Sequence, residues 1–386
     1  MTPAAPAATP ATGGAPGAGT PLRVFVNASA IGSSTGGTWA YLEGVLRGWQ
    51  RGNPNDALAI DAHPSFPEGL ERDLSGFATV RRGGGSRASV VLAQQSRTRS
   101  RARAFAADAV FNAALSAPLL GAGDRPEITM AHDIRHVERP QEFGRVALRY
   151  RKLVYERTIR RSAMLTCGSE STREAIVARL GIDPARVRAI PLGADHVDAW
   201  RRGPQGRHGV AFAHWSNKRP ETAIRVWGDL ARDPGFDREL HIVGAPADAR
   251  AALEELAREQ GVAQLVRVRA RVPDREFEEL LSGAAVLLFP SSLEGFGIPV
   301  VEAMRLGVPV VASAGAGMEG AGGKAALYAD PEVPAEFATH CRRLWADDAY
   351  RDAVVRAGIA HSAGYTWAAT AAATRTAISD AVARRS

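Results

Sequence analysis

Short apolar runs alternate with longer amphipathic stretches along the chain, and this alternation constrains the fold more than any other feature. In the first half the runs cover residues 22–28, 57–61, 108–112, 127–133, 163–169 and 187–193. In the second half they cover residues 209–215, 238–244, 265–272, 284–290, 309–313 and 325–330. Helical patterns such as 38–52 and 143–162 separate these runs. Because strand–helix alternation over short loops is typical of parallel sheets, we predict an α/β fold with helices on both faces of each sheet.

The two sets of runs are divided near residues 195–208. We therefore predict two Rossmann-like, doubly wound domains, over residues 21–197 and 198–364, that face each other across a cleft. Ligands of such sheets bind at the carboxyl ends of the strands, so the cleft is the expected site. Residues 1–20 are mainly Pro, Ala, Gly and Thr without charge, which predicts a disordered tail.

Composition is that of a globular protein. The chain has 386 residues, of which 45% are hydrophobic and 23% charged, enough for two domains of ordinary size. No apolar run approaches the roughly 20 residues that a membrane-spanning helix needs, and the tail lacks the pattern of a signal peptide. Cys167 and Cys341 stand far apart, which indicates neither a disulfide framework nor a zinc site. We expect a cytoplasmic protein.

Positive charge is concentrated in the first half of the chain. Residues 1–200 contain 25 basic and 18 acidic side chains, whereas residues 201–386 contain 23 of each. Nucleic acid is one partner that fits, with residues 97–103 (RTRSRAR) as its best local support, but no nucleic-acid motif accompanies them. An anionic membrane surface or an acidic acceptor fits equally well, and so does a solvated face in an arginine-rich protein. We expect no nucleic acid, and we keep peripheral contact with an anionic membrane as a candidate.

A glycine-rich loop follows the first expected strand. Residues 30–41 (AIGSSTGGTWAY) contain Gly32, Gly36 and Gly37 ahead of a helix. Thr38 stands where a P-loop has its lysine, and the spacing does not match the dinucleotide fingerprint G-x-G-x-x-G. Two interpretations remain: a backbone that approaches a phosphate closely at a helix N-terminus, or a tight turn that needs glycine.

Two carboxylates eight positions apart follow an expected buried strand in the second half. The segment 291–313 (SSLEGFGIPVVEAMRLGVPVVAS) places Glu294 on the loop after that strand and Glu302 early in the next helix, about one turn past Pro299. Both are expected to face the cleft, with Gly295 and Gly297 leaving room for a ligand. Carboxylates accept hydrogen bonds from pairs of hydroxyl groups, as in sugars and ribose. One glutamate alone could be a helix N-terminal charge, but this would not explain the pair with its glycines.

These residues resemble the E-x7-E motif of the family-4 retaining glycosyltransferases, which have the GT-B fold. The resemblance extends from about residue 22 over nearly the whole chain. Residues 166–195 resemble the segment that joins the two domains of that family, and residues 130–140 (MAHDIRHVERP) resemble its His-Asp stretch. The segments EAMRLGVPVVAS and GGKAALYADP are typical of its second half.

The resemblance implies roles for individual residues. Glu294 would hold hydroxyls of the donor sugar, helped by the N–H groups of Phe296 and Gly297, and Glu302 would hold the ribose of the nucleotide. Lys218 falls where the family has a lysine for the diphosphate.

From the other domain, which would bind the acceptor, Gly36 and Gly37 would approach the diphosphate, and His132 would lie beside the transferred sugar. Many relatives also have an arginine five or six residues before the lysine. Phe212 and Ala213 stand at those positions here, which leaves His214 and Arg219 as tentative phosphate-binding substitutes.

The implied reaction moves a hexose from a nucleoside-diphosphate sugar to a hydroxyl of a glycan, glycolipid or small-molecule acceptor, with retention of configuration. In the resembled family it needs neither a metal nor another cofactor, and the chain has no Asp-x-Asp motif. GDP-mannose is the first guess for the donor, followed by UDP- and dTDP-linked sugars. The alternatives are a GT-B-fold epimerase or phosphorylase and a non-catalytic glycosyltransferase-like subunit.

The end of the chain predicts a final helix. Residues 365–385 are rich in strong helix formers, with Thr366 as a candidate N-cap. In enzymes of the resembled kind the last helix, here 365–386, crosses back from the second domain to the first. We expect Trp367 to anchor it there.

Overall fold

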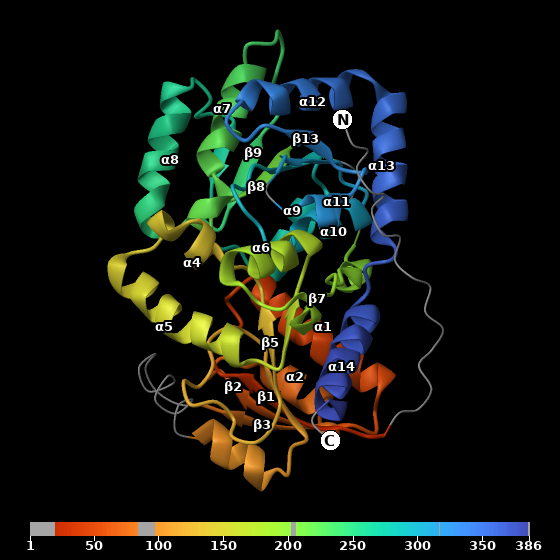
Figure 1. The fold of residues 1–386 in the computed structure, drawn as a ribbon. Coiled ribbons are helices and arrows are strands. Elements are labelled where there is room, and N and C mark those ends of the chain that lie inside the picture. Colours follow the sequence, from red (N-terminus) through yellow and green to blue (C-terminus); the bar gives the residue numbers. More distant parts are fainter. Residues whose placement is uncertain (1–19, 84–96, 202–205, 316, 385–386) are drawn as a thin grey trace, which may run out of the picture.

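The computed structural model describes residues 20–83, 97–201, 206–315 and 317–384 (Figure 1). The predicted disordered tail, except for its last residue, lies outside the described residues. Figure 1 shows two α/β units, with the red segment, where the described residues begin, in the lower one and most of the second half in the upper one.

The first sheet has seven parallel strands in the order β3-β2-β1-β4-β5-β6-β7. They are β1 (Arg23–Ala28), β2 (Ala57–Ala62), β3 (Ala78–Arg82), β4 (Ala109–Asn112), β5 (Glu127–Ala131), β6 (Met164–Cys167) and β7 (Val187–Ala189). Only β3 was not predicted. It lies at the sheet edge and has no buried residue, so its segment ATVRR carries no apolar run.

The second sheet has six parallel strands in the order β10-β9-β8-β11-β12-β13. They are β8 (Gly209–Phe212), β9 (Leu240–Val243), β10 (Val266–Val268), β11 (Val286–Phe289), β12 (Val310–Ser313) and β13 (Leu327–Ala329). Each run predicted as a strand contains one. In both sheets the strand order reverses beside the first strand of the set, which is where doubly wound sheets bind ligands.

Helices connect the strands of each sheet. Those of the first sheet are α1 (Gly37–Gly52), α2 (Glu68–Asp73), helical residues 97–104, α4 (Arg135–Glu138), α5 (Arg145–Arg161) and α6 (Glu170–Leu180). Those that follow are α7 (Pro220–Leu230), α8 (Ala247–Glu259), α9 (Asp274–Ser282), α10 (Ile298–Arg305), α11 (Glu319–Gly322), α12 (Pro334–Ala346), α13 (Asp348–Ser362) and α14 (Trp367–Ala383). Short 3-10 turns are η1 (Pro140–Glu142), η2 (Pro184–Arg186), η3 (Asp195–Ala199) and η4 (Ser216–Lys218). Within the described ranges, no helix has the length and apolar character that crossing a membrane requires.

Helices cover both faces of the first sheet, as the sequence predicts. Met130 on β5 packs in a core that also holds side chains of α1 and α14. On the opposite face, Leu165 of β6 packs with Ile159 of α5 and Ile176 of α6. Successive side chains of a strand point to opposite faces, so β5 and β6 are buried along their whole length rather than at every second residue.

The final helix returns to the first sheet. Thr366 caps α14 by accepting a hydrogen bond from the Ala369 N–H at 3.2 Å. Arg375 forms an ion pair with the buried Asp56 at 2.7 Å, and Figure 1 shows α14 beside α1 in the lower unit. The segment therefore joins α13, in the second unit, to the face of the first sheet.

Trp367, the first residue of α14, packs directly against α1. Its side chain is 6% exposed, and it occupies the space beside two glycines of α1. A Cβ on Gly44 would lie 2.1 Å from the indole, and one on Gly48 would lie 2.4 Å from the carbonyl oxygen of Trp367. Any larger residue at these positions would push α14 away from α1.

This packing predicts different outcomes for two glycines of the same helix. Gly48→Ala should destabilise the protein by about 1–3 kcal/mol, because the added methyl group meets backbone that cannot rotate away. Gly52→Ala is the matched control: a Cβ added there would have no neighbour within 4 Å, so it should be neutral or stabilising by about 0.4–1 kcal/mol. Thermal unfolding of both variants tests this, and equal melting temperatures would contradict the close packing.

Candidate active site

A cleft lies between the carboxyl ends of the two sheets. Its walls come from the loops after β1 and β5 of the first sheet and after β8 and β11 of the second. Most of the residues predicted to form the site line it: Gly36, Gly37, His132, His214, Lys218, Glu294, Phe296, Gly297 and Glu302. Arg219 is not among the lining residues.

The loop 291–297 is held against the first unit. A Cβ on Gly295 would lie 1.6 Å from the carbonyl oxygen of His132, so only glycine fits there. The carbonyl oxygen of Gly295 accepts hydrogen bonds from Ser169 Oγ at 2.6 Å and Thr172 Oγ1 at 3.1 Å. The sequence interpretation of Gly295 as space for a ligand is therefore incomplete, because contact between the units requires this glycine. Gly297, with φ 96°, is the N-cap of α10.

Glu294 is fixed through one of its two carboxylate oxygens. Lys218 Nζ donates to Glu294 Oε1 at 2.6 Å, and Asn217 Nδ2 donates to the same oxygen at 3.0 Å. Lys218 also lies over the ring of Phe289, 4.5 Å from its centroid. No side chain or backbone group of the described residues donates to Oε2, so this oxygen remains available to a ligand.

Glu302 is held in the same manner. Its Oε1 lies 3.0 Å from Nε2 of His196, and no described group donates to its Oε2. The indole N–H of Trp367 donates to Nδ1 of His196 at 3.0 Å, so the neutral ring carries its hydrogen on Nε2 and donates it to Glu302. Burial disfavours the imidazolium, but the hydrogen bond and charge of Glu302 outweigh it and raise the pKa of His196.

His132 lies on the opposite wall. Its Nε2 donates to the carbonyl oxygen of Ala113 at 3.0 Å. Burial lowers the pKa of His132, although that bond and the charge of Asp133 act against it. The ring is therefore neutral near pH 7, and its Nδ1 has a lone pair that can accept a hydrogen bond.

The glycine loop after β1 faces the second unit. A Cβ on Gly36 would lie 3.9 Å from His214 Nε2, and one on Gly37 would lie 3.7 Å from the Ile298 side chain. Gly36 has φ 59° and precedes α1. His214 and the start of α10 form one edge of the cleft, and the structure brings both glycines to this edge.

The two tentative phosphate-binding substitutes behave differently. Burial and the charges of Lys218 and Arg135 lower the pKa of His214 to about 3, so it supplies no positive charge at neutral pH. Arg219 forms an ion pair with Glu332 outside the cleft. Neither His214 nor Arg219 therefore brings a positive charge into the cleft.

Sequence reasoning missed three side chains at the site. His196 and Asn217 hold the two glutamates, and Arg135 donates to Asn217 Oδ1 at 2.8 Å from the opposite unit. Arg135 lines the cleft and is the cation that acts on His214 together with Lys218. Asn217 and Arg135 stand beside residues that the sequence singled out, but only their contacts distinguish them from other polar loop residues.

The pair of His196 and Glu302 predicts a pH-dependent contribution to stability. Because its pKa is raised in the folded protein, the stabilisation by charged His196 is present below about pH 6.5 and is lost as pH rises through the raised pKa. The advantage of the wild type over His196→Gln in melting temperature should therefore shrink from about pH 6 to pH 9.

His136 is the matched control, because burial lowers its pKa to about 4. Relative to His136→Gln, the wild type should lose stability as pH falls below about 6.5. A pH-independent difference for His196→Gln would contradict a titrating pair with Glu302.

Comparison with known proteins matches both halves of the chain. Residues 36–197 match the family described as Glycosyltransferase Family 4, and residues 209–347 match Glycosyl transferases group 1. The chain is 34% identical over 160 residues to D-inositol 3-phosphate glycosyltransferase of Corynebacterium diphtheriae, covering 40% of this chain and 38% of that protein. It is 34% identical over 102 residues to O-antigen chain mannosyltransferase B of Escherichia coli, covering 26% of this chain and 27% of that protein. The alignments thus span well under half the length of these two relatives.

The fold has been seen in solved structures. The crystal structure of Anabaena Alr3699/HepE in complex with UDP and glucose superimposes with a TM-score of 0.70 at 16% sequence identity, covering 93% of this chain and all of that one. At this identity the likeness concerns the fold alone, which is GT-B. Because the two family models match its two halves, residues 36–197 and 209–347, the chain belongs to the family-4 glycosyltransferases.

Proposed function

We propose that the protein transfers a hexose from a nucleoside-diphosphate sugar to a hydroxyl group of a glycan, glycolipid or small-molecule acceptor, with retention of configuration. Glu294 contacts the hexose, Glu302 the ribose and Lys218 the diphosphate, while His132 lies beside the sugar from the other wall. We assign charge stabilisation to these side chains and to backbone N–H groups rather than to a metal.

The proposal rests on the way in which protein donors hold the two carboxylates of the cleft. Glu294 and Glu302 both line the cleft, and protein donors hold one oxygen of each. The second oxygen of each has no donor among the described residues. A carboxylate held in this way can accept hydrogen bonds from hydroxyl groups without first changing its orientation. Sugars and ribose both supply such hydroxyls.

The charges in the cleft support the departure of a nucleoside diphosphate. Breaking the anomeric bond leaves positive charge on the sugar and adds negative charge to the phosphate. Lys218 donates one hydrogen to Glu294 and has two more N–H groups for phosphate oxygens. The loop amides near Gly36 and Gly37 approach the same region from the other unit. The leaving phosphate would take the acceptor proton, so the reaction needs no base from the protein.

Mannose is our first choice for the transferred sugar, with GDP as its carrier. The E. coli relative is described as a mannosyltransferase, which is consistent with this choice, although the match covers a quarter of the chain. A thermal-shift panel of GDP-, UDP-, ADP- and dTDP-sugars tests the donor. A ligand at 100 times its Kd stabilises by about 2.7 kcal/mol.

Turnover of the donor that binds distinguishes the possible reactions. Transfer to an acceptor hydroxyl with the same anomeric configuration supports the proposal, whereas inversion would overturn its stereochemistry. Epimerisation of the donor sugar, or its release by orthophosphate, would identify the GT-B-fold epimerase or phosphorylase instead. Binding without any turnover would indicate a non-catalytic subunit.

Glu302→Gln should weaken binding of the free nucleoside diphosphate. A glutamine has no negative charge, and it places an NH2 donor where the carboxylate has one of the two oxygens that face His196 and the ligand. Loss of a hydrogen bond to a charged group costs about 1.5–3 kcal/mol, which is roughly ten- to a hundredfold in Kd. Glu279→Gln, on the exposed side of α9 outside the cleft lining, is the matched control. Unchanged calorimetric affinity of the Glu302 variant would refute the ribose assignment.

Glu294→Gln should lower turnover far more than nucleotide affinity, because its second oxygen contacts only the transferred sugar. Loss of one such contact in the transition state typically costs about 2.7–4 kcal/mol, on the order of a hundred- to a thousandfold in kcat. Lys218→Ala should lower both quantities, since it removes the phosphate contact and the orientation of Glu294. Rates at saturating donor measure the effect on turnover, and the Kd for the nucleoside diphosphate measures the effect on affinity. A wild-type kcat in both variants would refute the placement of the active site at Glu294 and Lys218.

A further inference from the structure

Helix α5 presents a stripe of positive charge to solvent. Its exposed cations recur at helical spacing on one face, and they are Arg145, Arg149, Lys152, Arg157 and Arg160. No carboxylate of the described residues forms an ion pair with any of these five side chains. In contrast, several exposed arginines of the second unit form ion pairs, as Arg258 does with Glu255.

The same surface exposes large aliphatic side chains. Val146 and Leu153 of α5 are 84% and 61% exposed, and Leu120 of the neighbouring loop is 81% exposed. These three are the most exposed large apolar side chains in the described part of the chain. The loop is tied to the helix, because Arg157 Nε and Arg161 Nη1 both donate to the carbonyl oxygen of Leu119, at 2.8 and 3.0 Å.

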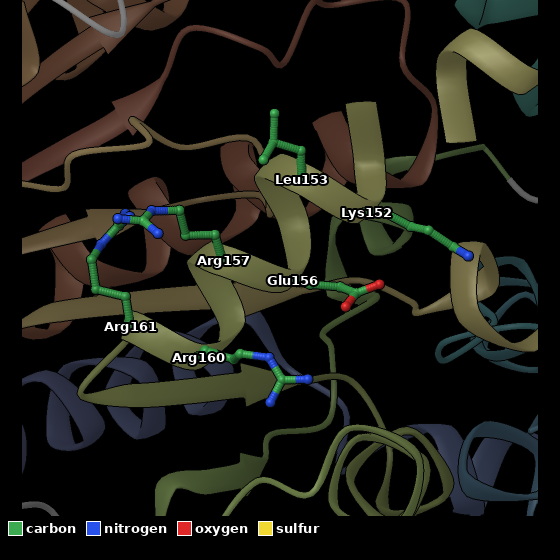
Figure 2. Close-up of a pocket in the computed structure, with 6 residues that line it drawn as sticks. All are labelled: Lys152, Leu153, Glu156, Arg157, Arg160 and Arg161. Carbon is green, nitrogen blue, oxygen red and sulfur yellow. The ribbon is translucent and has the colours of Figure 1, made fainter. Parts of the chain in front are cut away.

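Figure 2 shows how these side chains lie on the helix. Leu153 projects from the ribbon, Arg157 and Arg161 extend to one side of it, and Lys152 and Arg160 extend to the other. Together with Glu156 they line a shallow hollow on the surface. The exposed Leu153 is thus flanked by cations.

We propose that this surface of α5, with Leu120, docks the protein on an anionic lipid bilayer. Cations attract the negative surface of a bilayer that contains acidic lipids, and exposed aliphatic side chains enter its interfacial region. A soluble polyanion such as nucleic acid would explain the cations but would give the three aliphatic side chains no apolar surroundings.

The position of the helix relates this surface to the cleft. Ala147, Arg151 and Tyr155, on an adjacent face of α5, line the cleft. Docking through the exposed stripe therefore places the wall formed by the first unit next to the lipid. An acceptor anchored in the bilayer could reach this wall without leaving the membrane.

Vesicle binding by the full chain tests the proposal. The wild type should sediment with vesicles of phosphatidylcholine and phosphatidylglycerol at low salt, and should be released by high salt or when phosphatidylglycerol is omitted. Arg149→Gln combined with Lys152→Gln should weaken partitioning roughly thirtyfold, because each basic residue near the surface strengthens binding about fivefold. The matched control is Arg232→Gln with Arg275→Gln, whose side chains in the second unit are 78% and 86% exposed, and it should partition like the wild type.

A second pair of variants distinguishes lipid from a soluble polyanion. Val146→Ser with Leu153→Ser should weaken vesicle binding but leave binding to heparin or duplex DNA unchanged, because the charge is the same. Absence of binding by the wild type to phosphatidylglycerol vesicles at low salt would overturn the proposal. So would vesicle binding that the serine pair does not alter, which would identify the stripe as a polyanion site. Melting temperatures of all variants check that each remains folded.

Discussion

The arrangement of the two units depends on the packing of Trp367 against α1. Glycines at positions 44 and 48 leave space for the indole and for its backbone, and Gly193 lies equally close to the start of α14. The same indole donates to His196, which holds Glu302. A single side chain therefore joins the helix that crosses between the units to a carboxylate of the cleft.

A second contact fixes the opposite end of the cleft. The loop that carries Glu294 lies against the backbone of His132, and hydroxyl groups of Ser169 and Thr172 hold the carbonyl oxygen of Gly295. A buried carboxylate is costly unless charge and hydrogen bonds compensate it. Lys218 and Asn217 provide this compensation for Glu294 and at the same time determine which of its oxygens can meet a ligand.

Charge is distributed differently at the cleft and on the surface. In the cleft the two glutamates have partners, and His214 is held neutral by burial beside Lys218 and Arg135. On α5, in contrast, the exposed cations lack carboxylate partners among the described residues. Paired charges orient groups at short range, whereas unpaired cations on a surface act over about a Debye length. The first arrangement suits recognition of a small molecule, and the second suits an extended anionic surface.

The sequence alone determined the parallel sheets, their division into two units and the final helix, because hydrophobic periodicity and caps are local properties of the chain. The crossing of this helix back to the first unit was implied by the family resemblance. The rule that ligands bind at the carboxyl ends of the strands placed Glu294 and Glu302 at the cleft, whereas the family resemblance implied Lys218 and His132. The sequence did not predict β3, whose edge position leaves no apolar run, or the role of His196. Only the tertiary structure showed that Gly295 is required by His132 and that Arg219 pairs outside the cleft. These features depend on contacts between residues more than a hundred positions apart, or on a neighbour's charge and burial, and no local pattern records them.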